Sequence, residues 1–174
     1  MNVLITGVQN AIKDSAVKLA VGRIGAKARL RVLGFGDFLE EDVQGELQLL
    51  KSSQRKLMDS IQLKMLESGS KNIIINGYCT VRTRLGYYPF ITKESLAVFK
   101  PDLMVFIETD PVSLPGKLGN PKVLMEHQAV EKQFSMLLAA EAGAGIRFIR
   151  SGRDGAREGA DELYEVLKEA LVVR

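Results

Sequence analysis

The sequence predicts an α/β fold with a five-stranded, mostly parallel sheet and helices on its faces. Short apolar runs typical of buried strands alternate along the chain with segments of helical periodicity, and this alternation is typical of parallel α/β proteins. With 174 residues, 46% of them hydrophobic, the chain can bury one sizeable core. We therefore expect a single domain over residues 1–174, without repeats or low-complexity segments.

Five apolar runs mark the expected strands, and each is followed by a turn signal or a polar residue and then a helical pattern. The strands are predicted at 3–5, 30–33, 73–75, 103–107 and 146–149. Helices are expected near 14–25, 37–50, 51–68, 93–99, 125–142 and 155–172. Prolines and glycines interrupt any regular pattern over 110–121, which indicates a loop insertion there.

Composition limits the classes of function. The formal net charge is +3, from 24 Lys+Arg and 21 Asp+Glu, and this slight basic bias suits an anionic ligand without requiring nucleic acid. The one cysteine, Cys79, excludes an internal disulfide, and with one histidine, His127, the chain has no Cys/His set for zinc. We expect Cys79 to be inert and His127 to be a surface helix residue rather than a general base. No stretch approaches the ~18 apolar residues of a membrane span and no leader pattern opens the chain, so we expect a soluble, cytoplasmic protein.

The first informative stretch follows the first strand, because ligands of parallel sheets bind beyond the carboxyl ends of the strands. In the phosphate-binding pattern GxxxxGK[ST], backbone N–H groups surround the phosphates, the lysine reaches the outer phosphates and the hydroxyl holds magnesium. Gly7 and Lys13 have this spacing, but Ile12 replaces the second glycine and Asp14 replaces the hydroxyl residue. Two interpretations stay open: an altered phosphate loop, or a turn into a helix with a solvated lysine.

The next two strand ends also carry candidate ligand groups. After the second strand, Gly36 lies in a tight turn and Asp37 is positioned as a helix N-cap, which favours a structural role. Asn76, after the third strand, is neutral and cannot hold a magnesium shell as an aspartate would. The stretch "TVRTRLGYYP" (80–89) predicts a basic, hydroxyl-rich loop suited to a phosphate group. Arg82 is its best ligand candidate, and a solvated loop arginine is the alternative.

Six stretches in order, over nearly the whole chain, together resemble the archaeal-type adenylate kinases. They are "VLITGV" with Lys13, "VLGFGDFLEED" (32–42), "TVRTRLGYYP" (80–89), "KPDLMVFIETDP" (100–111), "EHQAVEKQFSM" (126–136) and "GAGIRFIRS" (143–151). The resemblance implies a three-layer P-loop NTPase-like fold with a helical nucleoside-monophosphate-binding insertion at 37–68 and a reduced lid at 110–124. It also implies phosphoryl transfer between ATP and AMP with magnesium, and a homo-oligomer, often a trimer.

The resemblance assigns candidate residues as well. Lys13 is the candidate catalytic residue. The nucleotide-binding candidates are Gly7, Lys13, Asp14 and Ser15 in the phosphate loop, Gly36 and Asp37 at the start of the AMP-side helices, and Arg82, Thr83, Gly86 and Tyr87 in the AMP-side loop. We expect no metal site built from the protein alone, and Mg²⁺ only together with a bound nucleotide.

Several positions depart from the family's pattern. The family's phosphate loop is rich in glycine and ends in lysine and threonines, and an aspartate and a histidine follow its third strand. The departures here are Asn10, Ile12, Asp14, Asn76 and Tyr78. The lid, which carries several arginines in the family, is the shorter "DPVSLPGKLGNPK", and an AMP-clamping arginine has no counterpart between Arg31 and Arg55.

These departures bear directly on activity. Phosphoryl transfer depends almost wholly on positioning and charge stabilisation, and one stabilising arginine can be worth a factor of ~10³–10⁵. The sequence therefore predicts an adenylate kinase relative that binds nucleotide at most, with weak or lost phosphoryl transfer. One alternative is an active nucleoside monophosphate kinase with an unusual phosphate loop. A second is an RNA- or ribosome-associated protein, indicated by the cluster of Lys18, Arg23, Lys27, Arg29 and Arg31, for which a solvated helix face is the simpler interpretation.

Overall fold

The computed structural model describes residues 1–8, 11–24, 30–35, 47–68, 72–111, 120–152 and 155–172. Within these residues, five strands form one sheet in the order β2-β3-β1-β6-β7, and every neighbouring pair is parallel. The strands are β1 (Asn2–Thr6), β2 (Arg31–Gly34), β3 (Ile73–Asn76), β6 (Leu103–Thr109) and β7 (Gly145–Ser151). The predicted α/β class and five-stranded sheet are confirmed, and each predicted apolar run contributes a strand.

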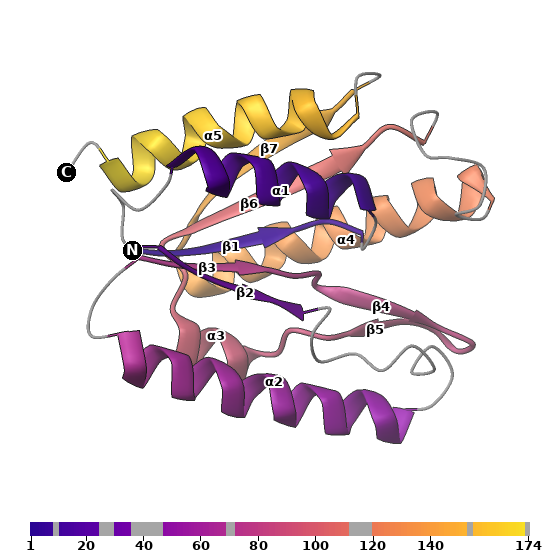
Figure 1. Ribbon diagram of the computed structural model, residues 1–174. Helices are drawn as coiled ribbons and strands as arrows, with labels where there is room; N and C mark the ends of the chain where they lie inside the picture. The colour runs from indigo at the N-terminus through magenta and orange to yellow at the C-terminus, as the bar shows by residue number, and fades with distance from the viewer. Residues whose placement is uncertain are drawn as a thin grey trace.

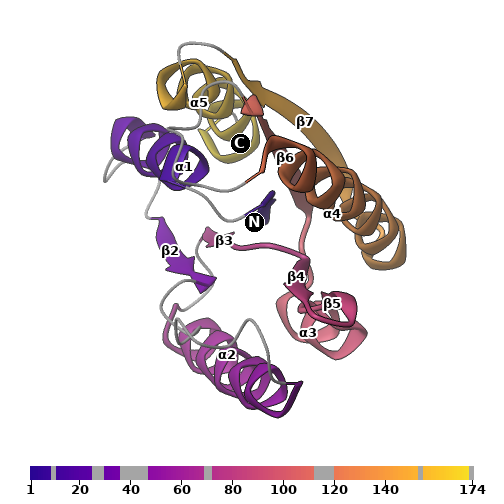
Figure 2. The same cartoon turned by 90° about the vertical axis from the view of Figure 1, so that its right-hand side faces the viewer.

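Helices cover both faces of this sheet, which gives three layers. They are α1 (Ala11–Ile24), α2 (Leu47–Ser68), α3 (Lys93–Phe99), α4 (Pro121–Ala142) and α5 (Ala156–Val172). In both views α1 and α5 lie together on one side of the sheet, while α2 and α3 lie on the opposite side (Figure 1, Figure 2). None of the described helices has both the length and the apolar composition that a membrane span needs.

Two helices begin earlier in the chain than expected. α4 begins at Pro121 rather than near 125, because the Asn120 side chain caps the helix and accepts a hydrogen bond from the backbone N–H of Lys122. α1 begins at Ala11 rather than near 14. The expected helix over 37–50 falls largely on residues outside the described ranges, and its last four residues, 47–50, belong to α2.

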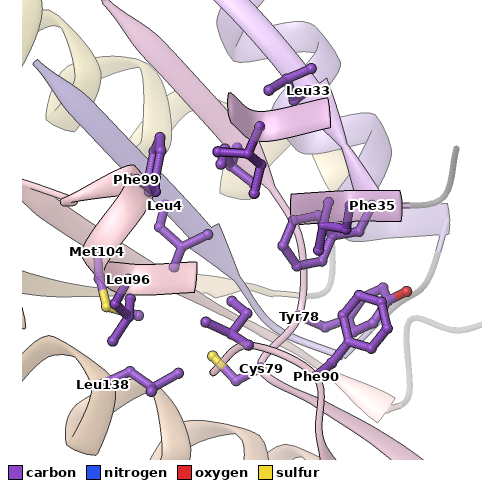
Figure 3. Packing of buried hydrophobic residues seen from close by; sticks show 14 of the residues in the cluster. Leu4, Leu33, Phe35, Tyr78, Cys79, Phe90, Leu96, Phe99, Met104 and Leu138 are labelled. Atoms are coloured by element: carbon purple, nitrogen blue, oxygen red, sulfur yellow. The ribbon is translucent and has the colours of Figure 1, made fainter. Parts of the chain in front are cut away.

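Alternating side chains of the strands divide the core into two clusters. In β1, Val3 and Ile5 pack with α1 and α5, whereas Leu4 packs with the cluster that includes side chains of α2, α3 and α4. Figure 3 shows this second cluster, in which Phe35, Tyr78 and Phe90 gather at one end. Because both faces are buried, the strands read as continuous apolar runs in the sequence.

A small antiparallel hairpin was not expected. β4 (Thr80–Thr83) and β5 (Gly86–Pro89) pair so that Arg82 is opposite Tyr87 and Thr83 is opposite Gly86. The stretch predicted as a loop over 80–89 is therefore mostly strand. The hydroxyl of Thr83 donates to the carbonyl of Gly86 at 2.9 Å, which closes the turn.

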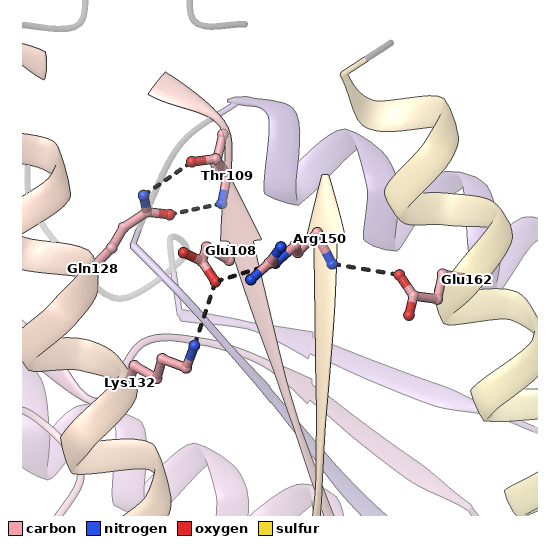
Figure 4. A network of polar contacts seen from close by, with 6 residues as sticks. All are labelled: Glu108, Thr109, Gln128, Lys132, Arg150 and Glu162. Carbon is pink, nitrogen blue, oxygen red and sulfur yellow. Dashed lines mark hydrogen bonds and ion pairs between the residues drawn. The ribbon is translucent and has the colours of Figure 1, made fainter. Parts of the chain in front are cut away.

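β7 forms one edge of the sheet, and α5 protects part of that edge. The backbone N–H of Arg150 donates to the carboxylate of Glu162 on α5 at 3.4 Å (Figure 4). Arg147 and Glu169 pair across the same two elements at 3.8 Å.

Candidate functional site

The strand order puts the switch point of the sheet at the carboxyl ends of β1 and β3, and we call the region beyond these two strand ends the crevice. The chain leaves β1 toward α1 on one face and leaves β3 toward the hairpin and α3 on the other (Figure 1). Neighbouring strands whose connections part in this way form the usual ligand site of open parallel sheets. Gly7 stands on the β1 side of this crevice, and Asn76, Gly77 and Tyr78 stand on the β3 side.

Gly7 has a structural reason to be glycine. Its φ is +137°, and a Cβ atom placed there would lie 2.5 Å from the carbonyl oxygen of Ile107 in β6. Both the backbone conformation and the close approach of β6 exclude a side chain. This glycine of the phosphate-loop pattern is therefore required by the fold itself, whatever it binds.

Lys13 lies in the first turn of α1 and is buried, with 1% of its surface exposed. Its ammonium donates to the carbonyl of Gly77 at 2.5 Å and to that of Gly7 at 3.3 Å, so it spans the crevice between β3 and β1. Burial lowers the pKa of Lys13, and the nearby carboxylates of Asp14 and Glu131 oppose that shift. It is not the solvated lysine of the simpler interpretation.

Asp14, which stands where a hydroxyl residue is usual, points toward the other strand. The side-chain N–H of Asn76 donates to its carboxylate at 2.9 Å, which joins α1 to the end of β3. Ser15 is exposed on α1, and Ile12 lies within that helix. In the described ranges Lys100 is the one non-glycine residue with positive φ, so the backbone of Ile12 does not need a glycine. Residues 9–10 lie outside those ranges.

Glu131, a fully buried carboxylate on α4, was not among the predicted site residues. It accepts hydrogen bonds from the backbone N–H of Cys79, and from the N–H and hydroxyl of Thr80 at 2.8 and 2.6 Å. Burial raises the pKa of Glu131, and these hydrogen bonds together with Lys13 oppose the rise. Glu131 therefore fixes the chain between β3 and β4 from the opposite side to Lys13.

Burial also raises the pKa of the Cys79 thiol well above its ordinary value. The thiol therefore stays protonated and unreactive, as expected.

The hairpin residues gather with the start of α4, away from the crevice. The Tyr87 ring packs on His127 with centroids 4.9 Å apart, and its hydroxyl donates to Glu126 at 3.1 Å. His127 Nε2 also lies 3.2 Å from the Thr80 hydroxyl. His127 is thus half-buried and engaged rather than a surface residue, and burial lowers its pKa.

The candidate residues therefore fall into two groups. Gly7, Lys13 and Asp14 meet at the crevice, with Ser15 exposed beside them, whereas Arg82, Thr83, Gly86 and Tyr87 share the hairpin, where Arg82 is exposed. The backbone of Thr80 and Cys79, held by Glu131, connects the two groups. Gly36, Asp37 and the middle of the expected lid, 112–119, lie outside the described residues.

A cavity of about 630 Å³ opens at the carboxyl ends of β6 and β7 beside α4. Lys132 and Arg150 line it, and both approach the carboxylate of Glu108, at 3.4 and 3.9 Å (Figure 4). Gln128 is buried and binds both the N–H and the carbonyl of Thr109, which fixes the end of β6. The volume suits a ligand the size of a nucleoside.

The basic cluster considered for RNA is partly neutralised. Arg23 pairs with Asp161, and Arg31 pairs with Glu67 at 3.3 Å. Lys27 and Arg29 lie outside the described ranges. The described part of this surface therefore gives little support to an RNA-binding role.

Comparison with known proteins finds relatives over nearly the whole chain, although no family model matches. An adenylate kinase of Thermococcus onnurineus is 27% identical over an alignment of 190 positions, which covers 97% of this chain and 96% of that protein. The adenylate kinase of Methanoculleus marisnigri is 27% identical, and the alignment covers 95% of this chain and 97% of that protein. The adenylate kinase of Pyrococcus furiosus is 26% identical, and the alignment covers 97% of this chain and 96% of that protein. Among solved structures, an unliganded sugar kinase from Janibacter sp. HTCC2649 matches with a TM-score of 0.49 and 13% identity, covering 99% of this chain and 94% of that one.

Proposed function

We propose that this chain, which is similar to archaeal adenylate kinases over nearly its whole length, binds a nucleotide while phosphoryl transfer between ATP and AMP is weak or lost. The observation that carries the proposal is the burial of Lys13. Its ammonium already binds the carbonyls of Gly7 and Gly77, on the two sides of the crevice.

A phosphate-loop lysine acts by reaching the outer phosphates of a triphosphate. Here the ammonium would have to give up two carbonyl oxygens and leave the neighbourhood of the buried carboxylate of Glu131. Asp14 adds a negative charge beside the crevice, where it would repel phosphate groups. Both features weaken the charge stabilisation on which phosphoryl transfer depends.

Nucleotide binding has support of its own. The cavity at the ends of β6 and β7 is of nucleoside size and is lined by Lys132 and Arg150, both of which approach the Glu108 carboxylate. Arg82, exposed on the hairpin, stays the candidate ligand for an AMP phosphate. The segment 37–68, of which the structure describes α2, stays the candidate helical AMP-side insertion. The segment 110–124 stays the candidate lid.

Magnesium would enter with the nucleotide. The described residues contain no group of three or more His, Cys, Asp or Glu that could hold a metal ion. Mg²⁺ on a nucleotide needs only one or two protein oxygens, because phosphates and waters supply the others. Asp14 and Asn76 carry such oxygens at the crevice, and the ion would neutralise phosphate charge there.

Assembly belongs to the proposal as well. Met136 and Phe148 are about half exposed and line a common cavity between α4 and β7. Exposed apolar side chains of this size favour a contact between copies, and we propose a homo-oligomer, a trimer by resemblance. Light scattering coupled to size-exclusion chromatography measures its mass.

Calorimetry and a coupled assay together test the functional proposal. Titration with ATP, AMP and a bisubstrate analogue should give binding of at least one of them, while ADP formation from ATP and AMP stays near background. Robust ADP formation that is abolished in Lys13→Ala would instead show an active kinase in which nucleotide draws the lysine out of its carbonyl contacts. Absence of binding for all three ligands would contradict the proposal.

A further inference from the structure

Two buried polar atoms at the end of β3 have no hydrogen-bond partner in the part of the chain that the structure describes. They are the hydroxyl of Tyr78 and Oδ1 of Asn76. A buried polar group without a partner is destabilising, and native proteins keep few of them. Both atoms stand on the β3 side of the crevice, opposite Gly7.

The ring of Tyr78 is fixed by other aromatic residues. Tyr78 is 3% exposed, and its ring lies edge-on to Phe35 with centroids 5.4 Å apart and tilted against Phe90 at 5.2 Å. Its hydroxyl oxygen points away from the aliphatic residues Leu4, Met104 and Leu138 of the cluster (Figure 3). Phenylalanine would make the same ring contacts, so packing does not explain the hydroxyl.

A buried cation lies beside Tyr78, and the carboxylates of Glu131 and Asp14 also act on it. The ammonium of Lys13 lies 5.9 Å from the centroid of the Tyr78 ring and is bound by the carbonyl of the preceding residue, Gly77. Burial raises the pKa of Tyr78 far above its ordinary value, so the hydroxyl keeps its proton and can donate.

The two unpaired atoms differ in what they can bind. Asn76 must turn its N–H₂ group toward Asp14, because a carboxylate only accepts hydrogen bonds, and this leaves Oδ1 as an acceptor. An acceptor cannot bind a phosphate oxygen, which is also an acceptor. Of the two, only the hydroxyl of Tyr78 can bind a phosphate.

We propose that the hydroxyl of Tyr78 donates a hydrogen bond to a phosphate oxygen of the bound nucleotide. This inference rests on the proposed function and adds to it a specific phosphate ligand on the β3 side of the crevice. It needs no phosphoryl transfer, because a donor to a phosphate contributes to binding alone.

Tyr78→Phe tests the inference, because it removes the hydroxyl and keeps the ring. The variant should unfold at the same temperature as the wild type or higher, because an unpaired buried group is lost. The Kd of AMP or ATP, whichever the wild type binds, should rise roughly tenfold, since hydrogen bonds to charged groups are the stronger ones. The Kd of adenosine, which has no phosphate, should stay the same. Tyr164→Phe on α5, where the ring contacts Arg23 and Lys168, is the matched control and should change neither value.

Three results would overturn this role for Tyr78: equal nucleotide affinity in Tyr78→Phe and wild type, equal losses for AMP and adenosine, or a lower unfolding temperature that reveals an internal partner. A wild-type chain that binds neither ATP nor AMP is a different result, because it contradicts the proposed function before any variant is compared.

Discussion

The ammonium of Lys13 lies 2.5 Å from the carbonyl oxygen of Gly77, so a helix and the end of a neighbouring strand are joined by a buried cation. Glu131 approaches the same segment from α4 and binds the two backbone N–H groups that follow Tyr78. The crevice between β1 and β3 is therefore held by opposite charges from two helices on opposite faces of the sheet.

Lys13→Ala is expected to lower the free energy of unfolding by about 3–5 kcal/mol, because it leaves the buried carbonyls of Gly7 and Gly77 without this donor and removes a cation near the buried Glu131 carboxylate. Chemical denaturation measures the change. Lys18→Ala, an exposed position on the same helix, is the control and should stay within about 0.5 kcal/mol of wild type. Similar stabilities of the two variants would show that the buried lysine contributes nothing to the fold. In a Lys13→Met/Glu131→Gln double variant, the loss of unfolding free energy should be smaller than the sum of the losses in Lys13→Met and in Glu131→Gln.

Asn76→Asp is expected to destabilise the protein by about 1–3 kcal/mol, because it replaces the 2.9 Å hydrogen bond to Asp14 with two facing carboxylates. Adding Asp14→Thr removes the repulsion and should restore most of the stability, as thermal unfolding would show. The double variant also restores two residues of the family's pattern, so it is the one in which we expect any gain in ADP formation. A stable Asn76→Asp single variant would contradict the contact.

His127 is expected to titrate below its ordinary pKa of 6.5, because burial between the hairpin and α4 disfavours its charged form. At a pH between the pKa of His127 in the folded chain and its pKa in the unfolded chain, the unfolded chain binds a proton more readily than the folded chain. Stability should therefore be complete above about pH 6.5 and fall as the pH decreases through that window. NMR titration of the single histidine gives the folded pKa directly, and His127→Gln should flatten this part of the stability profile. A folded pKa above 6.5 would reverse the sign and contradict the structure.

The strands and most helices could be predicted from the sequence. Both faces of the sheet are buried, so its strands are continuous apolar runs separated by polar turns. The hairpin over 80–89 was read as a loop because its strands are four residues each and their charged and hydroxyl side chains hide the alternation. Its pairing of β-branched and aromatic residues around a short turn was the signal available.

The site was harder to predict because its key residues look ordinary in sequence. Lys13 has the spacing of a phosphate-loop lysine, and nothing local tells whether its side chain turns outward or back toward Gly77. Glu131 follows an ordinary helical pattern, and only the tertiary fold brings the backbone of Cys79 and Thr80 against it. Gly7, in contrast, stands out in the sequence through the phosphate-loop spacing, and the contact with β6 explains this glycine without any ligand.

The pairing of Glu162 with the backbone of Arg150 has a consequence for how copies of this chain can meet. An open sheet margin invites another chain to continue the ladder, and a carboxylate placed on an outward amide discourages that addition. Copies that associate next to β7 would therefore join through side chains such as Phe148 and Met136, not by continuing the backbone ladder of the sheet.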